Sequence, residues 1–242
     1  EGANGAKKEF PGKAADSADG AKKVFPGKDA DIAKGASAAD AKDAKDETNR
    51  APRVPMETKA IIQGVNLIFR TKPTLFSPTS VDRGTMAMLS RVSFGEGEKV
   101  LDLGCGYGVA GIWAAKLIGQ ENVFMIDNDD DAIKFAKINA ELNGVPGIST
   151  TKSDGFRDFN EAGFSLVLSN PPYHSDFSVP KHFIEKGFNR LRLGGRMMMV
   201  THRLPWYKNK LSSVFGGVKV EEDNGYFVFT AEKRSMTYAN SK

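Results

Sequence analysis

The sequence contains a single cysteine, Cys105, and only three histidines among its 242 residues. One thiol forms no internal disulfide and cannot supply a multi-cysteine zinc site, so disulfide-stabilised domains and cysteine-rich zinc modules are excluded. The spacing of His, Asp and Glu does not match any metal-binding motif either. We therefore expect a protein of a reducing compartment, the cytoplasm, that needs no metal.

Long apolar runs are also missing. The continuous runs that exist, such as Val123–Ile126 and Met197–Val200, have the length of a strand. A helix that crosses a bilayer needs about 20 apolar residues, so we expect no membrane segment. The first residues contain no apolar stretch of the kind found in signal peptides, and we expect none.

The composition is that of a folded protein with a basic bias. Hydrophobic residues make up 40% of the chain and charged residues 26%, which is enough for a large core. The formal net charge is +4. A basic balance of this kind fits a polyanionic partner such as RNA.

Residues 1–55 differ from the rest of the chain. They are rich in Ala, Lys, Asp and Gly, and the segment GAKKEFPGK at 5–13 returns as GAKKVFPGK at 20–28. Each copy carries one aromatic residue, Phe10 or Phe25, which buries too little surface to offset the entropy of ordering the segment. We predict a flexible low-complexity tail over 1–55 and one folded domain over 56–242.

Strand and helix patterns alternate in the predicted domain. After a short strand at 65–69, strands are predicted at 99–104, 122–127, 148–152, 165–170, 196–202, 218–222 and 226–231. Helices are predicted to begin at 85 and to span 109–118, 131–143, 179–191 and 206–215, and the crossover at 154–163 has room for one turn only. This alternation predicts the α/β class, with a doubly wound, mostly parallel, seven-stranded sheet that binds its ligand at the carboxyl ends of the strands.

A glycine-rich loop follows the strand at 99–104. It reads Leu101-Asp102-Leu103-Gly104-Cys105-Gly106-Tyr107-Gly108 and leads directly into a helix. Gly104, Gly106 and Gly108 let the backbone turn sharply and let a ligand lie against it. The spacing of Gly106, Gly108 and Gly111 also occurs in dinucleotide-binding sites.

Acidic residues near the glycine loop distinguish between a dinucleotide and S-adenosylmethionine as the cofactor. Asp127, followed by Asn128, ends the next strand, where a carboxylate can bond the ribose hydroxyls of either cofactor. Asp102 would repel a pyrophosphate, but it favours the cationic amino and sulfonium groups of S-adenosylmethionine. Asp154 can accept a bond from an adenine amino group, with Phe156 against the ring, although a capped turn explains this pair equally well. We therefore predict S-adenosylmethionine as the cofactor.

The motif Asn170-Pro171-Pro172-Tyr173-His174 follows the fourth strand of the sheet. The prolines remove two backbone donors and leave carbonyl acceptors in a rigid loop. These acceptors and the Asn170 side chain can hold the hydrogens of an exocyclic amine and aim its lone pair at a methyl carbon. Tyr173 can stack an extruded base, and His174 can contact the base or its phosphate. The pattern predicts N-methyl transfer, with the residues from Asn170 to Tyr173 as the catalytic ones.

Residues 60–233 resemble the small-domain (MTS) methyltransferases, which include guanine-N2 methyltransferases of ribosomal RNA. The likeness rests on the glycine loop, Asp127, Asn170–Tyr173, the strand at Gly225-Tyr226-Phe227, and residues 71–85, which are similar to this family's cap over the cofactor. Residues 71–85 are called the cap segment below. This segment and His174 make the chain more similar to the guanine-N2 branch of the family than to its other branches. The resemblance implies a Rossmann-like class I methyltransferase with an antiparallel last strand, S-adenosylmethionine as cofactor and ribosomal RNA as partner.

Other functions remain open at this point. The Asn-Pro-Pro motif is shared with adenine-N6 methyltransferases of tRNA or rRNA and with protein glutamine-N5 methyltransferases. A non-catalytic module that binds S-adenosylmethionine or RNA is a third alternative, against which the intact Asn170 motif argues. Basic residues that can form a rim near the active face are Arg190, Arg192, Arg203, Lys208 and Lys210, although solvated charges explain them as well.

Overall fold

The computed structural model describes residues 56–172 and 176–239. They all belong to the unit that spans Pro52–Lys242. The predicted tail, residues 1–55, lies outside the described residues, and so do Tyr173 and His174.

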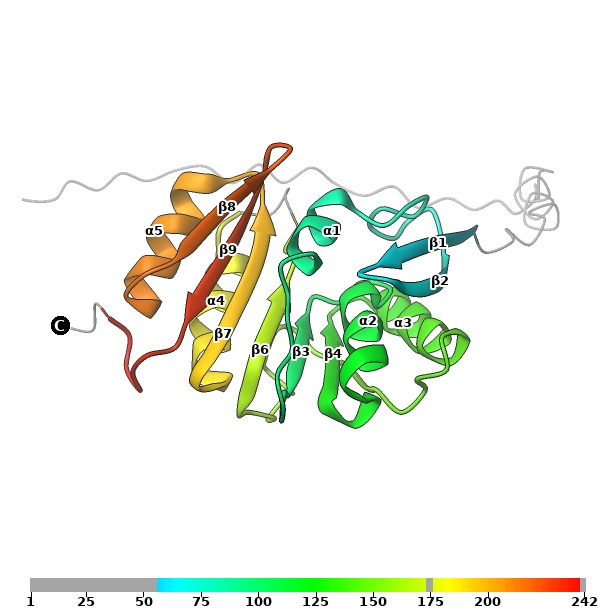
Figure 1. Cartoon of the computed structure of the whole chain (residues 1–242), viewed down its shortest axis with the longest axis horizontal. Coiled ribbons are helices and arrows are strands. Elements are labelled where there is room, and N and C mark those ends of the chain that lie inside the picture. Colours follow the sequence, from blue (N-terminus) through cyan, green and yellow to red (C-terminus); the bar gives the residue numbers. More distant parts are fainter. Residues whose placement is uncertain (1–55, 173–175, 240–242) are drawn as a thin grey trace, which may run out of the picture. The chain divides into compact units, whose positions relative to one another are not determined.

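Seven strands form one sheet in the order β5-β4-β3-β6-β7-β9-β8 (Figure 1). Their bounds are β3 Val100–Leu103, β4 Val123–Asp127, β5 Ser149–Lys152, β6 Phe164–Ser169, β7 Leu191–Thr201, β8 Lys219–Asp223 and β9 Tyr226–Glu232. The five strands β5, β4, β3, β6 and β7 are parallel to one another. The last strand, β9, runs antiparallel to both β7 and β8. The predicted fold, a doubly wound sheet with an antiparallel last strand, is confirmed.

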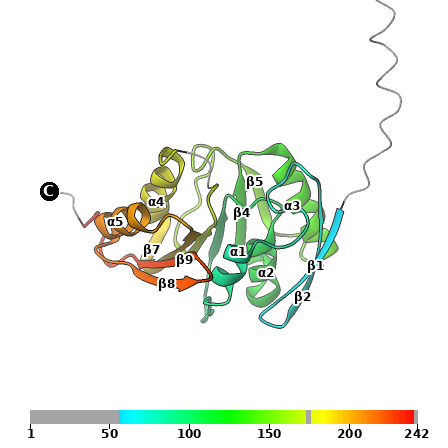
Figure 2. The same ribbon diagram turned by 90° about the horizontal axis from the view of Figure 1, so that it is seen from above.

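Helices cover both faces of this sheet (Figure 2). One face packs against α1 (Arg83–Leu89), α2 (Val109–Ile118) and α3 (Asp130–Leu142), and the other against α4 (Ser178–Arg190) and α5 (Leu204–Phe215). Side chains of a strand point alternately to the two faces. Val100 therefore joins the first core, whereas Leu101 and Leu103 join the second. Burial on both faces is the reason why the central strands are continuous apolar runs.

A separate hairpin of β1 (Met56–Ile62) and β2 (Val65–Thr71) packs beside α2 and α3. Two amide side chains attach it: Asn139 of α3 and Asn143, the residue at the carboxyl-terminal cap of α3. Asn139 exchanges hydrogen bonds of 2.7 and 3.0 Å with the backbone of Arg70, and Asn143 does the same with Ile68 at 3.1 and 2.7 Å. The two amides thus bond the backbone N–H and C=O groups at the edge of β2, as a neighbouring strand would.

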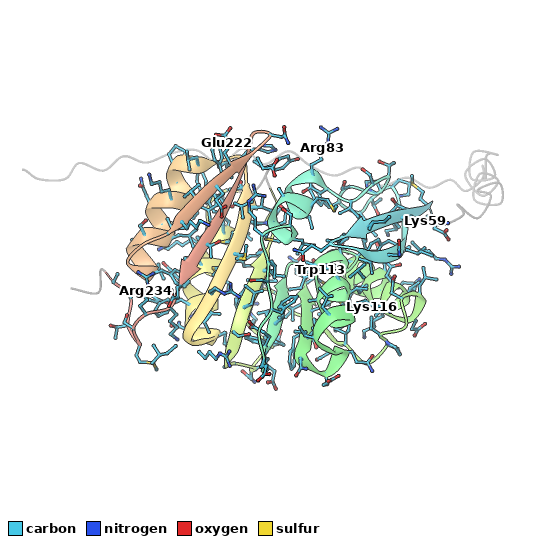
Figure 3. All side chains as sticks on the ribbon, viewed as in Figure 1. Lys59, Arg83, Trp113, Lys116, Glu222 and Arg234 are labelled. Carbon is cyan, nitrogen blue, oxygen red and sulfur yellow. The ribbon has the colours of Figure 1, made fainter. Side chains whose placement is uncertain are left out.

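Trp113 strengthens the same attachment. Its side chain is fully buried in α2, and its Nε1 donates to the carbonyl of Ile62 in β1 at 3.2 Å. Figure 3 shows Trp113 between α2 and the hairpin. Because residues 71–85 follow β2 directly, this packing fixes where the cap segment begins.

The predicted start of one strand moves by five residues. β7 begins at Leu191, whereas the sequence predicts a start at 196. The first residues of the strand do not show a strand pattern, because they contain Gly194 and Gly195 and because the pairing with β6 shifts register after Phe164. Gly194, which has a φ of +76°, donates its N–H to the carbonyl of Lys233 at 2.9 Å, and the Lys233 N–H donates to the carbonyl of Gly195 at 2.8 Å. In the part of the chain that the structure describes, no helix has the length and apolar character needed to cross a membrane.

Candidate active site

A cavity of about 370 Å³ lies at the carboxyl ends of β3, β4 and β6. Doubly wound sheets bind their ligands at this edge. The residues lining it include Asp82, Thr85, Asp102, Gly104, Gly106, Asp127, Asn128, Asp154, Asn170 and Pro172. The structure therefore brings most of the predicted cofactor residues together with the first residue of the predicted catalytic motif.

Gly108 and Pro171 do not line this cavity. A Cβ added to Gly108 would lie 2.9 Å from Ile112 Cδ1 and 3.4 Å from the Ala136 backbone. Gly108, which has a φ of +96°, begins α2, and its role in the fold is close packing of that helix. Pro171 is buried.

The glycine loop presents bare backbone to the cavity. Gly104 and Gly106 have φ angles of +73° and +54°, which side chains rarely tolerate. Apart from the two chain neighbours of Gly106, no atom of the described residues lies within 4 Å of a Cβ built on it, so a side chain there would project into open space at the cavity. A ligand can lie directly against this backbone.

Asp127 connects β4 to the glycine loop. One of its carboxylate oxygens accepts the Gly106 N–H at 2.9 Å, and the other accepts the Asp129 N–H at 3.0 Å. Burial raises the pKa of Asp127, and the N–H donors oppose that shift. Each carboxylate oxygen has further acceptor capacity, so this residue can also bond ribose hydroxyls.

Asp102 is the more deeply buried of the two aspartates, with 4% of its surface exposed. Its Oδ2 accepts the Gly111 N–H at 2.7 Å. Burial raises the pKa of Asp102 to about 7; the Gly111 N–H lowers this pKa and the charge of Asp127 raises it. Its charge therefore changes near neutral pH, and a cation beside it would favour the ionised form.

The side chains of Asp154 and Phe156 lie in different parts of the structure. Asp154 lines the cavity and pairs with Arg157 at 3.7 Å, with both side chains largely exposed. Phe156 does not line the cavity. It packs in the second core, with its ring 6.4 Å from that of Phe159, so the structure does not support its expected place against an adenine ring.

Asn170 lies directly after β6, and contacts from the cap segment hold its side chain. Its Nδ2 donates to Asp82 Oδ2 and to Thr85 Oγ1, both at 2.9 Å. Asp82 also caps α1 by accepting the Thr85 N–H at 2.8 Å, and it accepts the Tyr226 hydroxyl at 3.3 Å. Asp82 and Thr85 are site residues that the sequence patterns do not single out, although an Asp directly before a helix is a preferred N-cap residue.

The predicted basic rim is wrong for Arg190 and Arg192. These residues lie at the amino end of β7, where Arg190 donates to the carbonyls of Phe159 and Asn160 at 2.8 Å. That edge is opposite to the cavity. Lys210 forms an ion pair with Glu185.

An aromatic pair lies on the cavity side of α4 and α5. The rings of Phe177 and Trp206 stack with centroids 4.4 Å apart, and the Arg203 guanidinium lies 5.1 Å from the centre of the Phe177 ring. Phe177 is 37% exposed and precedes Val179, which lines the cavity. Lys208 is exposed on the same helix as Trp206. Aromatic and guanidinium planes of this kind are common in surfaces that bind single-stranded nucleic acid.

Several known proteins are similar to this chain. "Ribosomal RNA small subunit methyltransferase C" of Psychromonas ingrahamii is 29% identical over 170 residues, which cover 69% of this chain and 48% of that protein. "Ribosomal RNA large subunit methyltransferase G" of a Shewanella species is 30% identical over 194 residues, which cover 75% of this chain and 50% of that protein. The chain thus spans about half the length of these curated relatives.

Among solved structures, the 16S rRNA N2 G1207 methyltransferase of T. thermophilus, in complex with AdoMet and guanosine, superimposes with a TM-score of 0.68 at 28% identity. The alignment covers 74% of this chain and 50% of that one. Residues 66–230 match the model of the family described as "Methyltransferase small domain". That match spans more than half of the chain, which therefore belongs to the methyltransferase small domain family.

Proposed function

We propose that this protein transfers a methyl group from S-adenosylmethionine to the exocyclic N2 amine of a guanine in ribosomal RNA. The observation that carries the proposal is the position of Asn170. Its side chain lines the same cavity as the glycine loop, and its amide nitrogen is bonded to Asp82 and Thr85. A hydrogen-bond acceptor for a substrate amine and a cofactor cradle thus share one site.

The residues of the cavity fit the proposed cofactor. The open backbone at Gly106 and Gly104 permits close approach of a ligand. Asp127, with Asn128 beside it, would accept the ribose hydroxyls, and Asp102 would attract the cationic amino group. Asp154 at the rim would accept a bond from the adenine amine. When bound, S-adenosylmethionine supplies an electrophilic methyl group on a sulfonium.

The chain's own residues would act by positioning the amine. An exocyclic amine is a weak nucleophile because its lone pair is delocalised into the ring. Acceptors in the loop from Asn170 to Pro172, where the prolines contribute carbonyls and no N–H, would hold the amine hydrogens and turn the lone pair toward the reacting carbon. The same acceptors stabilise the positive charge that develops on nitrogen. Tyr173 and His174 complete the proposed base-binding residues.

The choice of guanine in ribosomal RNA is supported by the relatives. Two are named as ribosomal RNA methyltransferases, and the solved relative is in complex with guanosine. Phe177, Trp206 and Arg203 offer a surface for the neighbouring nucleotides. The proposal includes a cytoplasmic location. Adenine-N6 and glutamine-N5 transfer are the other outcomes of the test.

Transfer of a labelled methyl group tests the proposal directly. The protein is incubated with methyl-tritiated S-adenosylmethionine and with separate ribosomal RNA, tRNA and protein fractions, and the labelled product is then identified by mass spectrometry of its nucleosides or amino acids. We expect N2-methylguanosine from ribosomal RNA. N6-methyladenosine or N5-methylglutamine as the labelled product would replace the proposed function by one of the alternatives, and no transfer at all would refute it.

A further inference from the structure

We propose that Asp82 is a positioning residue that sets which end of the Asn170 side-chain amide faces the substrate. The inference rests on the proposed function, in which the amide oxygen of Asn170 accepts a bond from the substrate amine. It concerns a residue 88 positions away in the chain, on the cap segment, that contacts Asn170 through one hydrogen bond of 2.9 Å.

The chemistry of a carboxylate determines the direction of that bond. An ionised aspartate accepts hydrogen bonds and has no proton to donate, whereas a side-chain amide has a donor end and an acceptor end. The NH₂ end of Asn170 therefore faces Asp82, and the planar amide turns its oxygen away from Asp82. The reversed amide would bring two oxygen atoms together at 2.9 Å without a hydrogen between them.

The Thr85 hydroxyl also accepts a hydrogen bond from the NH₂ end of Asn170. Its hydroxyl lies 3.4 Å from Asp82 Oδ2 and 2.9 Å from the Asn170 nitrogen. Because the hydroxyl proton can be donated to the carboxylate, a hydroxyl lone pair is left to accept from Asn170. Both acceptors of the Asn170 NH₂ group are thus set by the charge of Asp82.

Asp82 is itself fixed from two further directions. It accepts the Thr85 N–H at 2.8 Å at the start of α1, and the hydroxyl of Tyr226 in β9 reaches its other oxygen at 3.3 Å. Gly84 makes this arrangement possible, because a Cβ there would lie 2.6 Å from the Tyr226 ring. The cap segment, β6 and β9 therefore meet at one carboxylate.

The orientation matters for the choice of nucleophile. An amide oxygen directed at the substrate binds the hydrogens of an amine and stabilises positive charge on its nitrogen. An amide NH₂ in its place would oppose both. We therefore expect the loss of the Asp82 charge to lower the rate of methyl transfer, with little effect on binding of the cofactor.

The test is an exchange of the two side chains. Asn170→Asp alone places two carboxylates in contact, so we expect methyl transfer to fall at least about 100-fold. Adding Asp82→Asn supplies an NH₂ group that donates to the new carboxylate at position 170, whose second oxygen remains an acceptor for the amine. This NH₂ group takes the place of Oδ2, which also accepts the Thr85 N–H, so the double variant loses the cap of α1 and is assayed below its lowered Tm. We expect this double variant to recover at least about tenfold in kcat over Asn170→Asp, with KM for RNA and Kd for S-adenosylmethionine within about twofold of the wild type.

Asp82→Asn alone keeps one oxygen. In one amide direction this oxygen both caps α1 and accepts from Asn170, as Oδ2 does in the wild type; in the other direction an NH₂ group faces Asn170 and the cap is lost. We expect the variant to fold, with a Tm lowered by no more than a few degrees. We expect its kcat to fall about tenfold, because the amide pair can now adopt either direction. Glu222→Gln is the matched control: it removes one negative charge at the tip of β8, on the same edge of the molecule as Arg83 of α1 (Figure 3). We expect the control to keep the wild-type kcat.

The outcomes separate the two proposals. A wild-type protein that methylates no fraction would refute the proposed function, whatever the variants do. If the wild type is active and Asn170→Ala is not, the proposed function stands. In that case an unchanged kcat in Asp82→Asn, or no recovery in the double variant, would overturn the role of Asp82 alone.

Discussion

Asp102→Asn is expected to stabilise the ligand-free protein at alkaline pH and to weaken its binding of S-adenosylmethionine. Burial raises the pKa of Asp102 from 3.8 to about 7. The folded chain therefore binds this proton more tightly than the unfolded chain does. The resulting penalty on folding is absent below pH of about 4, grows as the pH rises toward about 7, and is constant above that value.

The magnitude follows from the size of the shift. About three pKa units at about 1.4 kcal/mol each give an upper value of about 4 kcal/mol at pH 8. Asparagine removes the charge and keeps an oxygen for the Gly111 N–H, which is bonded to Asp102 at 2.7 Å. We expect Asp102→Asn to raise the free energy of unfolding by about 1–4 kcal/mol at pH 8 and by less than about 2 kcal/mol at pH 5. Urea denaturation at the two pH values measures both quantities.

Cofactor affinity should change in the opposite direction. If the ionised carboxylate attracts the cationic ligand, affinity falls as Asp102 is protonated, by about 20-fold between pH 7.5 and pH 5.5. The amino group of the ligand stays mostly protonated in this range, because its ordinary pKa is near 8.

Isothermal titration calorimetry of the wild type and Asp102→Asn measures this dependence. Burial also raises the pKa of Asp127, so the comparison with Asp102→Asn isolates the part due to Asp102. A wild-type affinity that is constant over the range, or a variant less stable than the wild type at pH 8, would refute the reasoning.

Three further changes test other parts of the structure. Asp127→Ala should weaken binding of S-adenosylmethionine at least about 30-fold in calorimetry, because it removes the ribose acceptor and the anchor of Gly106; an unchanged Kd would contradict the cofactor assignment. Asn139→Ala should lower the free energy of unfolding by about 2–4 kcal/mol, because this fully buried amide bonds the backbone of β2; a loss below about 0.5 kcal/mol would contradict its role. Trp206→Ala should raise KM for RNA about 5- to 50-fold at similar kcat. Leu193→Ala, an exposed change at the opposite edge, is its control, and equal KM values for the two variants would remove Trp206 from the RNA surface.

The central sheet could be predicted because its strands are buried on both faces and therefore appear as uninterrupted apolar runs. The hairpin strand β1 could not be predicted in this way. Its exposed positions carry Glu57 and Lys59, and its partner β2 is held by amides from a distant helix. That attachment is a tertiary contact that a local pattern does not record.

The glycine loop and Asn170 could be located because local motifs at strand ends carry them. Arg190 and Arg192 were assigned to the wrong edge because β7 begins at Leu191, which places both at the amino ends of the strands. Asp82 contacts Asn170 across 88 positions of the chain. Only the fold shows that the cap segment and the end of β6 meet.

The most direct measurement of the central claim compares Asn170→Ala with the wild type in single-turnover methyl transfer to ribosomal RNA, with the Kd for S-adenosylmethionine measured in parallel. We expect the rate to fall at least about 100-fold while the Kd changes less than about twofold, because the variant removes an acceptor for the amine and leaves the glycine loop intact. A variant that methylates guanine at the wild-type rate would contradict the account.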